Sequence, residues 1–179
     1  MMLPPFPQDE AWRLDVLRRH DLLSSAHDPF LDALATTVAR SFRVPMSAVS
    51  LIDAEGQFFK ARVGLPVRST PRSCSFCAHT LWWPAPLVVL DALEDERFND
   101  NPLVTGDPRI RFYAGAPIHL HGVCLGTLCV LDHRPWSDFG DAEMRFLRGA
   151  SMAVEERLIQ MTRSPQAEQG VSAAEDRAA

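Results

Sequence analysis

Two cysteines and a histidine lie close together in the middle of the chain, at Cys74, Cys77 and His79. This spacing is compatible with zinc binding, because thiolate and imidazole groups are the usual ligands of structural zinc. A fourth ligand could come from Cys124, Cys129 or His121, but such sites usually contain two close ligand pairs and a second close pair is missing. Cys124 and Cys129 are an odd number of positions apart in a predicted strand, so we expect their side chains to point to opposite faces. The sequence therefore predicts no metal site.

Redox chemistry is a second possible use of the same residues. A Cys-x-x-Cys motif lowers the pKa of a thiol when it lies at the N-terminus of a helix, and Cys74 or Cys77 is expected at such a position. The chain has four cysteines and no secretory signal, so we expect reduced thiols rather than disulfides.

Other polar and aromatic side chains lie beside predicted strands, where small-molecule pockets are usually lined. Asp91 follows one apolar run and Arg111 opens another, so the two either bind a charged ligand or form an internal salt bridge. For His79 the competing interpretation is a hydrogen-bonded structural residue, and for Asn101 it is loop architecture. The predicted ligand-binding residues are Phe76, Cys77, His79, Asp91, Asn101, Arg111, Tyr113 and Gly115. We expect all of them except Asn101 to surround one cavity.

Length and composition define the class of protein. The 179 residues, 46% of them hydrophobic and 23% charged, predict one globular domain. A net charge of -5 without a basic stripe argues against nucleic acid and anionic membranes as partners. The N-terminus lacks the features of a secretory signal and no apolar run is long enough to span a bilayer, so we expect a cytoplasmic protein.

Apolar residues at intervals of three and four predict helices over residues 9–23, 28–42 and 138–161. Asp28 followed by proline is typical of a helix start. A shorter helix is expected over residues 76–82.

Runs rich in β-branched and aromatic residues predict two hairpins. The first joins residues 46–52 to residues 58–63 through a turn at 53–56, and the second joins residues 110–120 to residues 123–131 through His121 and Gly122. Strict alternation would place Ile110 on the same face as Phe112. We also expect a short strand over residues 87–90, and Gly126 beside Gly115, leaving room for a pocket.

Hairpins flanked by helices predict an α+β fold with an antiparallel sheet. In addition, the runs SFCAHT, VVLDALEDERFNDNPLVTGDPRIRFYAGAPI and CLGTLCVLDHRPW resemble the second half of a bacterial GAF domain. The resemblance extends over residues 25–160 and is densest over residues 73–135. It implies a sheet of about six strands, with terminal helices packed on one face and an irregular, pocket-forming segment on the other. We divide the chain into an N-terminal extension with its helix (1–24), a GAF-like domain (25–162) and a disordered tail (163–179).

The resemblance implies a non-catalytic, sensory domain that binds a small molecule and acts in signal transduction through a partner protein or a dimer. The sequence identifies neither the ligand nor a cofactor. One alternative is a ligand-free GAF domain used for dimerisation or protein interaction. A second is a thiol-dependent redox enzyme, because free methionine sulfoxide reductases are also GAF proteins.

We expect homodimerisation through the terminal helices, because their apolar stripes are long enough to serve both the core and a neighbouring chain. The predicted contact residues are Trp12, Val16, His20, Leu23, Leu147, Val154, Leu158 and Met161.

Overall fold

The computed structural model describes residues 1–23, 27–82 and 85–163. Its centre is a six-stranded antiparallel sheet with the strand order β3-β2-β1-β6-β5-β4. The strands are β1 (Met46–Ile52), β2 (Gly56–Val63), β3 (Ser69–Pro71), β4 (Leu87–Val89), β5 (Phe112–Leu120) and β6 (Val123–Asp132). The helices are α1 (Glu10–Arg19), α2 (Pro29–Phe42), α3 (Phe76–Thr80), α4 (Pro102–Thr105) and α5 (Asp141–Arg163), with a 3-10 turn, η1 (Arg72–Cys74).

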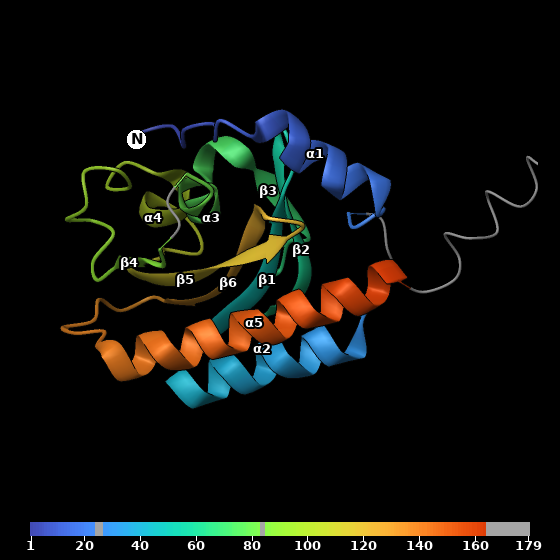
Figure 1. Ribbon diagram of the computed structural model, residues 1–179. Helices are drawn as coiled ribbons and strands as arrows, with labels where there is room; N and C mark the ends of the chain where they lie inside the picture. The colour runs from blue at the N-terminus through green and yellow to red at the C-terminus, as the bar shows by residue number, and fades with distance from the viewer. Residues whose placement is uncertain (24–26, 83–84, 164–179) are drawn as a thin grey trace, which may run out of the picture.

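Two layers cover the sheet. Figure 1 shows α2 and α5 side by side under one face, whereas α3, α4 and the loops around β4 lie on the other. The predicted α+β fold, with an antiparallel sheet and an irregular segment opposite the helices, is confirmed. The predicted tail, residues 163–179, lies outside the described residues except for Arg163, which ends α5.

Both predicted hairpins form. His121 and Gly122 both have positive φ angles, of 50° and 83°, which is the geometry of the two-residue turn that matches strand twist. The short elements β3, η1 and α4 were not predicted, because none is long enough to show a periodicity in the sequence.

Alternation along the strands divides the core into two clusters. Phe112, Ala114 and Ala116 of β5 pack towards α2 and α5. Tyr113 belongs to the opposite cluster, together with Cys129 of β6 and Phe76 and Cys77 of α3. This second face carries the cavity described below.

The N-terminal helix is packed into the same core. Val16 and Leu17 of α1 are buried among residues of the sheet and of α2 and α5. Arg13 is also buried, and its guanidinium donates hydrogen bonds to the carbonyl of Ile52 and to the carboxylate of Glu10. The helix is therefore held to the end of β1 by both apolar and ionic contacts.

Three expectations about faces and neighbours are wrong. Ile110 packs in the cavity-side cluster and not beside Phe112, because β5 begins only at Phe112 and alternation does not extend to Ile110. Gly126 pairs with Ile118, whereas Gly115 pairs with Cys129. The close approach at Gly126 is to β1, because a Cβ atom there would lie 1.9 Å from the carbonyl oxygen of Ser50.

The third error concerns Cys124, which packs against the same cluster as Cys129 and not on the opposite face. In the pairing of β5 with β6, Ile118 faces Gly126 and His119 faces Cys124, so Leu125 is an extra, unpaired residue of β6. This bulge lies between the two cysteines. The extra residue of a bulge reverses the alternation beyond it.

The apolar stripes of the terminal helices face the chain's own core. Four of the eight residues predicted to contact a second chain are fully buried within one chain: Val16, Leu147, Val154 and Leu158. A dimer cannot use these side chains while the domain is folded. Among the described residues, no helix is long and apolar enough to cross a membrane.

Candidate functional site

A cavity of about 410 Å³ lies on the face of the sheet opposite α2 and α5. Its floor is formed by β2, β5 and β6, and its walls by α3, by residues 65–71 and by residues 103–110. Most of the lining is apolar, with a small number of polar groups, which is the usual composition of a small-molecule site. The lining residues are Gln57, Phe59, Leu65, Pro66, Val67, Ser69, Thr70, Pro71, Phe76, Cys77, Leu103, Asp107, Pro108, Ile110, Tyr113, Cys129 and Leu131.

Helix α3 brings Phe76 and Cys77 to this cavity. The helix starts where the hydroxyl of Ser75 accepts a hydrogen bond from the amide of Ala78, at 3.0 Å. The same hydroxyl donates to the side chain of Gln57 on β2. This N-cap therefore ties the start of α3 to the sheet, which fixes the position of the cavity wall.

A cluster of sulfur and hydroxyl groups lies at the cavity floor, where Cys77, Cys129 and Tyr113 line the cavity. The Sγ atoms of Cys77 and Cys129 are 3.8 Å apart. The Tyr113 hydroxyl lies 3.4 Å from the Sγ of Cys77 and 3.4 Å from the hydroxyl of Thr127. Ser50 extends the chain, since its hydroxyl lies 3.5 Å from that of Thr127. All five side chains are buried.

The cluster separates the acidities of its two thiols. Burial alone would raise the pKa of Cys77, but hydrogen bonds with the thiol of Cys129 and with the hydroxyl groups of Ser50, Thr127 and Tyr113 lower it to about 6. The hydrogen bond to Cys77 and burial raise the pKa of Cys129 well above its usual range. Burial and the charge of Cys77 raise the pKa of Tyr113 in the same way. The arrangement makes Cys77 the more acidic of the two thiols.

Gly115 contributes through its missing side chain. A Cβ atom at this position would lie 2.1 Å from the hydroxyl oxygen of Tyr113, because Tyr113 and Gly115 face the same side of β5 and the tyrosine ring lies over the glycine. The glycine thus allows Tyr113 to reach Cys77 and Thr127.

His79 lies outside the cavity lining. Its ring makes an edge contact with Phe98, with centroids 4.8 Å apart, and it borders a separate hollow with Met2, Leu3 and Arg97. Burial and the nearby charge of Arg97 lower the pKa of His79 to about 4. The imidazole is therefore neutral at physiological pH and packs beneath the N-terminal segment.

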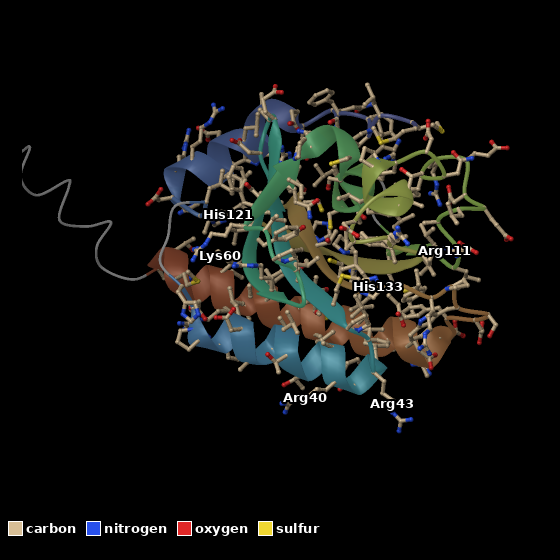
Figure 2. All side chains as sticks on the ribbon, turned by 180° about the vertical axis from the view of Figure 1, so that it is seen from behind. Arg40, Arg43, Lys60, Arg111, His121 and His133 are labelled. Atoms are coloured by element: carbon tan, nitrogen blue, oxygen red, sulfur yellow. The ribbon has the colours of Figure 1, made fainter. Side chains whose placement is uncertain are left out.

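Asp91 and Arg111 satisfy each other. The Nε and Nη2 atoms of Arg111 donate to the two carboxylate oxygens of Asp91 at 2.7 and 2.5 Å. The hydrogen bonds from this guanidinium hold the pKa of Asp91 below its ordinary value. Figure 2 shows Arg111 towards one edge of the molecule, on the side opposite Lys60 and His121. Of the two interpretations left open by the sequence, the structure has the internal salt bridge.

Asn101 holds the loops behind the cavity together. Its side-chain nitrogen donates to the carbonyl of Cys74 at 3.0 Å, and its side-chain oxygen accepts from the amide of Leu103, capping α4. This buried amide is part of the loop architecture and positions Leu103 in the cavity wall.

Of the predicted site residues, the structure brings Phe76, Cys77 and Tyr113 to one cavity. We also expected His79, Asp91, Arg111 and Gly115 to surround this cavity. That expectation is wrong, because none of the four is among the residues that line it. Whether the residues that do line the cavity bind a ligand stays a prediction.

The sequence interpretation missed Cys129 and the walls at residues 65–71 and 103–110. Cys129 was detectable, because alternation along β6 places it on the same face as Thr127 and Leu131, and Leu131 pairs with Tyr113 of β5. Within the described part of the chain, no group of three or more histidine, cysteine, aspartate and glutamate side chains is arranged to hold a metal ion.

The comparisons with known proteins agree with this architecture. The family model described as "GAF domain" matches residues 27–158, which is most of the chain. The chain belongs to the GAF domain family. Its sequence is 37% identical, over 159 residues, to a protein named cyclic di-GMP phosphodiesterase from Pseudomonas aeruginosa. The match covers 88% of this chain but only 27% of that relative, so this GAF chain corresponds to about a quarter of its length.

Solved GAF structures have the same fold. The GAF domain of Acinetobacter phosphoenolpyruvate-protein phosphotransferase is 22% identical, with a TM-score of 0.63, and the match covers 83% of this chain and 93% of that one. A free methionine-R-sulfoxide reductase from Neisseria meningitidis is 16% identical, with a TM-score of 0.62 and coverage of 91% and 97%. At these identities the likeness shows the fold alone, so it does not separate a sensor from a reductase.

Proposed function

We propose that this GAF domain is a sensory module that binds a small, largely apolar molecule in the cavity between α3 and the sheet. The cavity itself is the observation that carries this proposal. Its volume of about 410 Å³ is within the range of small-molecule sites, and its few polar groups could orient a ligand on an apolar floor.

The relative from Pseudomonas aeruginosa supports a role in signalling. That protein is named as a cyclic di-GMP phosphodiesterase, and the region similar to this chain is a minor part of it. We propose that this chain regulates a signalling activity and is not itself an enzyme. A cytoplasmic location stays a prediction from the N-terminal sequence.

Native mass spectrometry of the freshly purified chain tests ligand binding. We expect a non-covalent adduct on the reduced protein that is lost on denaturation. Leu103→Trp fills part of the cavity and should abolish the adduct, whereas Leu93→Trp should retain it, because Leu93 is exposed and does not line the cavity. Circular dichroism checks that both variants fold.

Two outcomes would contradict the proposal. A wild-type chain without an adduct, whose melting temperature no compound in a metabolite library raises, would favour the ligand-free interaction domain. Thioredoxin-dependent turnover of free methionine sulfoxide, lost in Cys77→Ser, would instead identify a reductase.

A further inference from the structure

The pair formed by Cys77 and Cys129 has a geometry that ligand sensing does not explain. The two cysteines come from α3 and β6, far apart in the sequence, and their sulfur atoms are in contact at 3.8 Å. A disulfide bond is about 2.05 Å long, so the two sulfur atoms must approach by less than about 2 Å to form one. Both thiols are free in this structure.

The surroundings of the pair differ from those of the other cysteines. Three hydroxyl groups and the thiol of Cys129 stabilise the thiolate of Cys77, and a thiolate is the nucleophilic form of cysteine. By contrast, burial raises the pKa of Cys74, and it raises that of Cys124 to about 11. Nucleophilic character is therefore concentrated at one sulfur, with a protonated thiol beside it.

The cavity is the route by which a small reagent would reach Cys77, which is itself only 2% exposed. Cys77 and Cys129 both line it, and so does Val67, which is 46% exposed at the molecular surface. Hydrogen peroxide is neutral and about as small as water, so entering an apolar cavity of about 410 Å³ costs it little compared with a charged oxidant.

We propose that Cys77 and Cys129 form a peroxide-reactive dithiol site at the floor of the cavity, with Cys77 as the attacking residue and Cys129 as the resolving residue. This modification site goes beyond the proposed ligand sensing and does not depend on it.

The chemistry balances with hydrogen peroxide as the oxidant. The Cys77 thiolate attacks one peroxide oxygen; an S–O bond forms, the O–O bond breaks, and the departing hydroxide takes up a proton to become water. The product is a sulfenic acid at Cys77, whose sulfur has lost two electrons to the peroxide. Cys129 then gives up its proton and attacks this sulfur; the S–S bond forms, the S–O bond breaks, and a second water leaves. In total, two thiols and one peroxide become one disulfide and two waters.

Oxidation would also change the cavity floor. The disulfide removes the negative sulfur that accepts the Tyr113 hydroxyl, and it links α3 covalently to β6. The disulfide thereby fixes the cavity wall to its floor. The shape of the cavity then depends on the oxidation state of the two cysteines as well as on a bound ligand.

The test treats the reduced full chain with one equivalent of hydrogen peroxide and measures intact mass and disulfide-linked peptides. We expect the wild type to lose the mass of two hydrogen atoms and to yield a peptide linking Cys77 to Cys129, with reversal by dithiothreitol. Cys129→Ser should stop at a sulfenic acid on Cys77 that dimedone traps. Cys77→Ser should leave Cys129 unmodified at the same dose.

Cys74→Ser and Cys124→Ser are the matched controls and should react as the wild type does. The proposal is overturned if the wild type remains reduced when glutathione in the same tube is oxidised, or if the linked peptide contains Cys74 or Cys124. Both measurements use wild-type protein, so they hold even if a cysteine variant fails to fold. They also leave the ligand test on reduced protein unaffected, so either proposal can fail alone.

Discussion

The position of the Tyr113 side chain depends on the glycine at residue 115. The tyrosine is completely buried, and its hydroxyl reaches Cys77 and Thr127 only because the neighbouring glycine has no side chain. A buried hydroxyl without its partners would cost about 1–3 kcal/mol, so the position of the ring matters for stability as well as for the thiol.

We expect Gly115→Ala to destabilise the domain by about 1–3 kcal/mol, because the added methyl group displaces the Tyr113 ring in a packed core. Gly149→Ala is the matched control. A Cβ atom there meets nothing within 4 Å on the exposed side of α5, so better helix propensity should stabilise the chain by up to about 1 kcal/mol. Urea unfolding measures both, and equal effects would contradict the role assigned to Gly115.

The acidity of Cys77 predicts how the peroxide reaction depends on pH. The thiolate exists above the pKa of the folded chain, about 6, so the rate of disulfide formation should rise through that pH and level off near neutrality. Cys129 and Tyr113 are the titratable groups that face it, and both stay protonated there, because their pKa values are raised.

Tyr113→Phe removes one of the hydroxyl groups that stabilise the thiolate and should move the midpoint of this profile to higher pH. Stopped-flow measurement of thiol loss from pH 5 to pH 9 would show it. A wild-type midpoint near the ordinary cysteine value, unchanged by Tyr113→Phe, would refute the stabilised thiolate.

At the scale of helices and strands, long periodic segments were predictable and short ones were not. The helix after Asp28 and both hairpins follow directly from caps, turns and alternation. The face of Cys124 did not follow, because a bulge has no signature in alternation and reverses every face beyond it. The residues of the site were predictable only where they lie on long, regular helices or strands. Tyr113 lies on a regular strand, whereas Leu65 and Leu103 reach the cavity from loops whose course depends on tertiary contacts.

The side chain of Asp28 links α2 to α5. One carboxylate oxygen caps α2 by accepting from the amide of Leu31, and the other accepts from Arg157 of α5 at 2.9 Å. Asp28→Ala should cost about 1–2 kcal/mol or more, since it removes the cap and leaves Arg157 without its partner. Asp28→Asn keeps a capping oxygen and should cost less, and Arg157→Ala should resemble Asp28→Asn. Thermal unfolding at pH 7 ranks the three, and a loss for Asp28→Asn equal to that for Asp28→Ala would show that the cap contributes nothing.

The same carboxylate predicts a direction with pH. Burial alone would raise the pKa of Asp28, but the hydrogen bonds from Arg157 and Leu31 lower it overall. The resulting stability is complete above the ordinary carboxyl pKa of about 3.9 and is lost as the pH falls through the lower value in the folded chain. The stability difference between wild type and Asp28→Asn, followed by urea unfolding, should therefore shrink below pH 4. A difference that grows on acidification would contradict this linkage.

In the whole molecule, α3, which lines the cavity, and the long helices α2 and α5 lie on opposite faces of one sheet (Figure 1). If the proposed ligand or dithiol acts on the long helices, its effect has to cross β5 and β6, whose residues alternate between the cavity cluster and the α5 side. Tyr113 and Phe112 are adjacent in β5 and belong to opposite clusters, so displacement of one backbone segment acts on both faces.

Homodimerisation stays a prediction, and the structure changes the residues that could support it. Leu158 is fully buried, so Leu158→Glu should unfold the domain and cannot report on a dimer. Met152 lies on the outer surface of α5 with 58% of its side chain exposed, and Trp12 of α1 is also exposed. If α5 transmits the signal to a second chain, its outer surface is the part available for contact. Light scattering at micromolar concentration should then show a dimer that Met152→Glu dissociates without lowering the melting temperature. A monomeric wild type would leave α5 without a second chain to act on, and transmission would require a different partner.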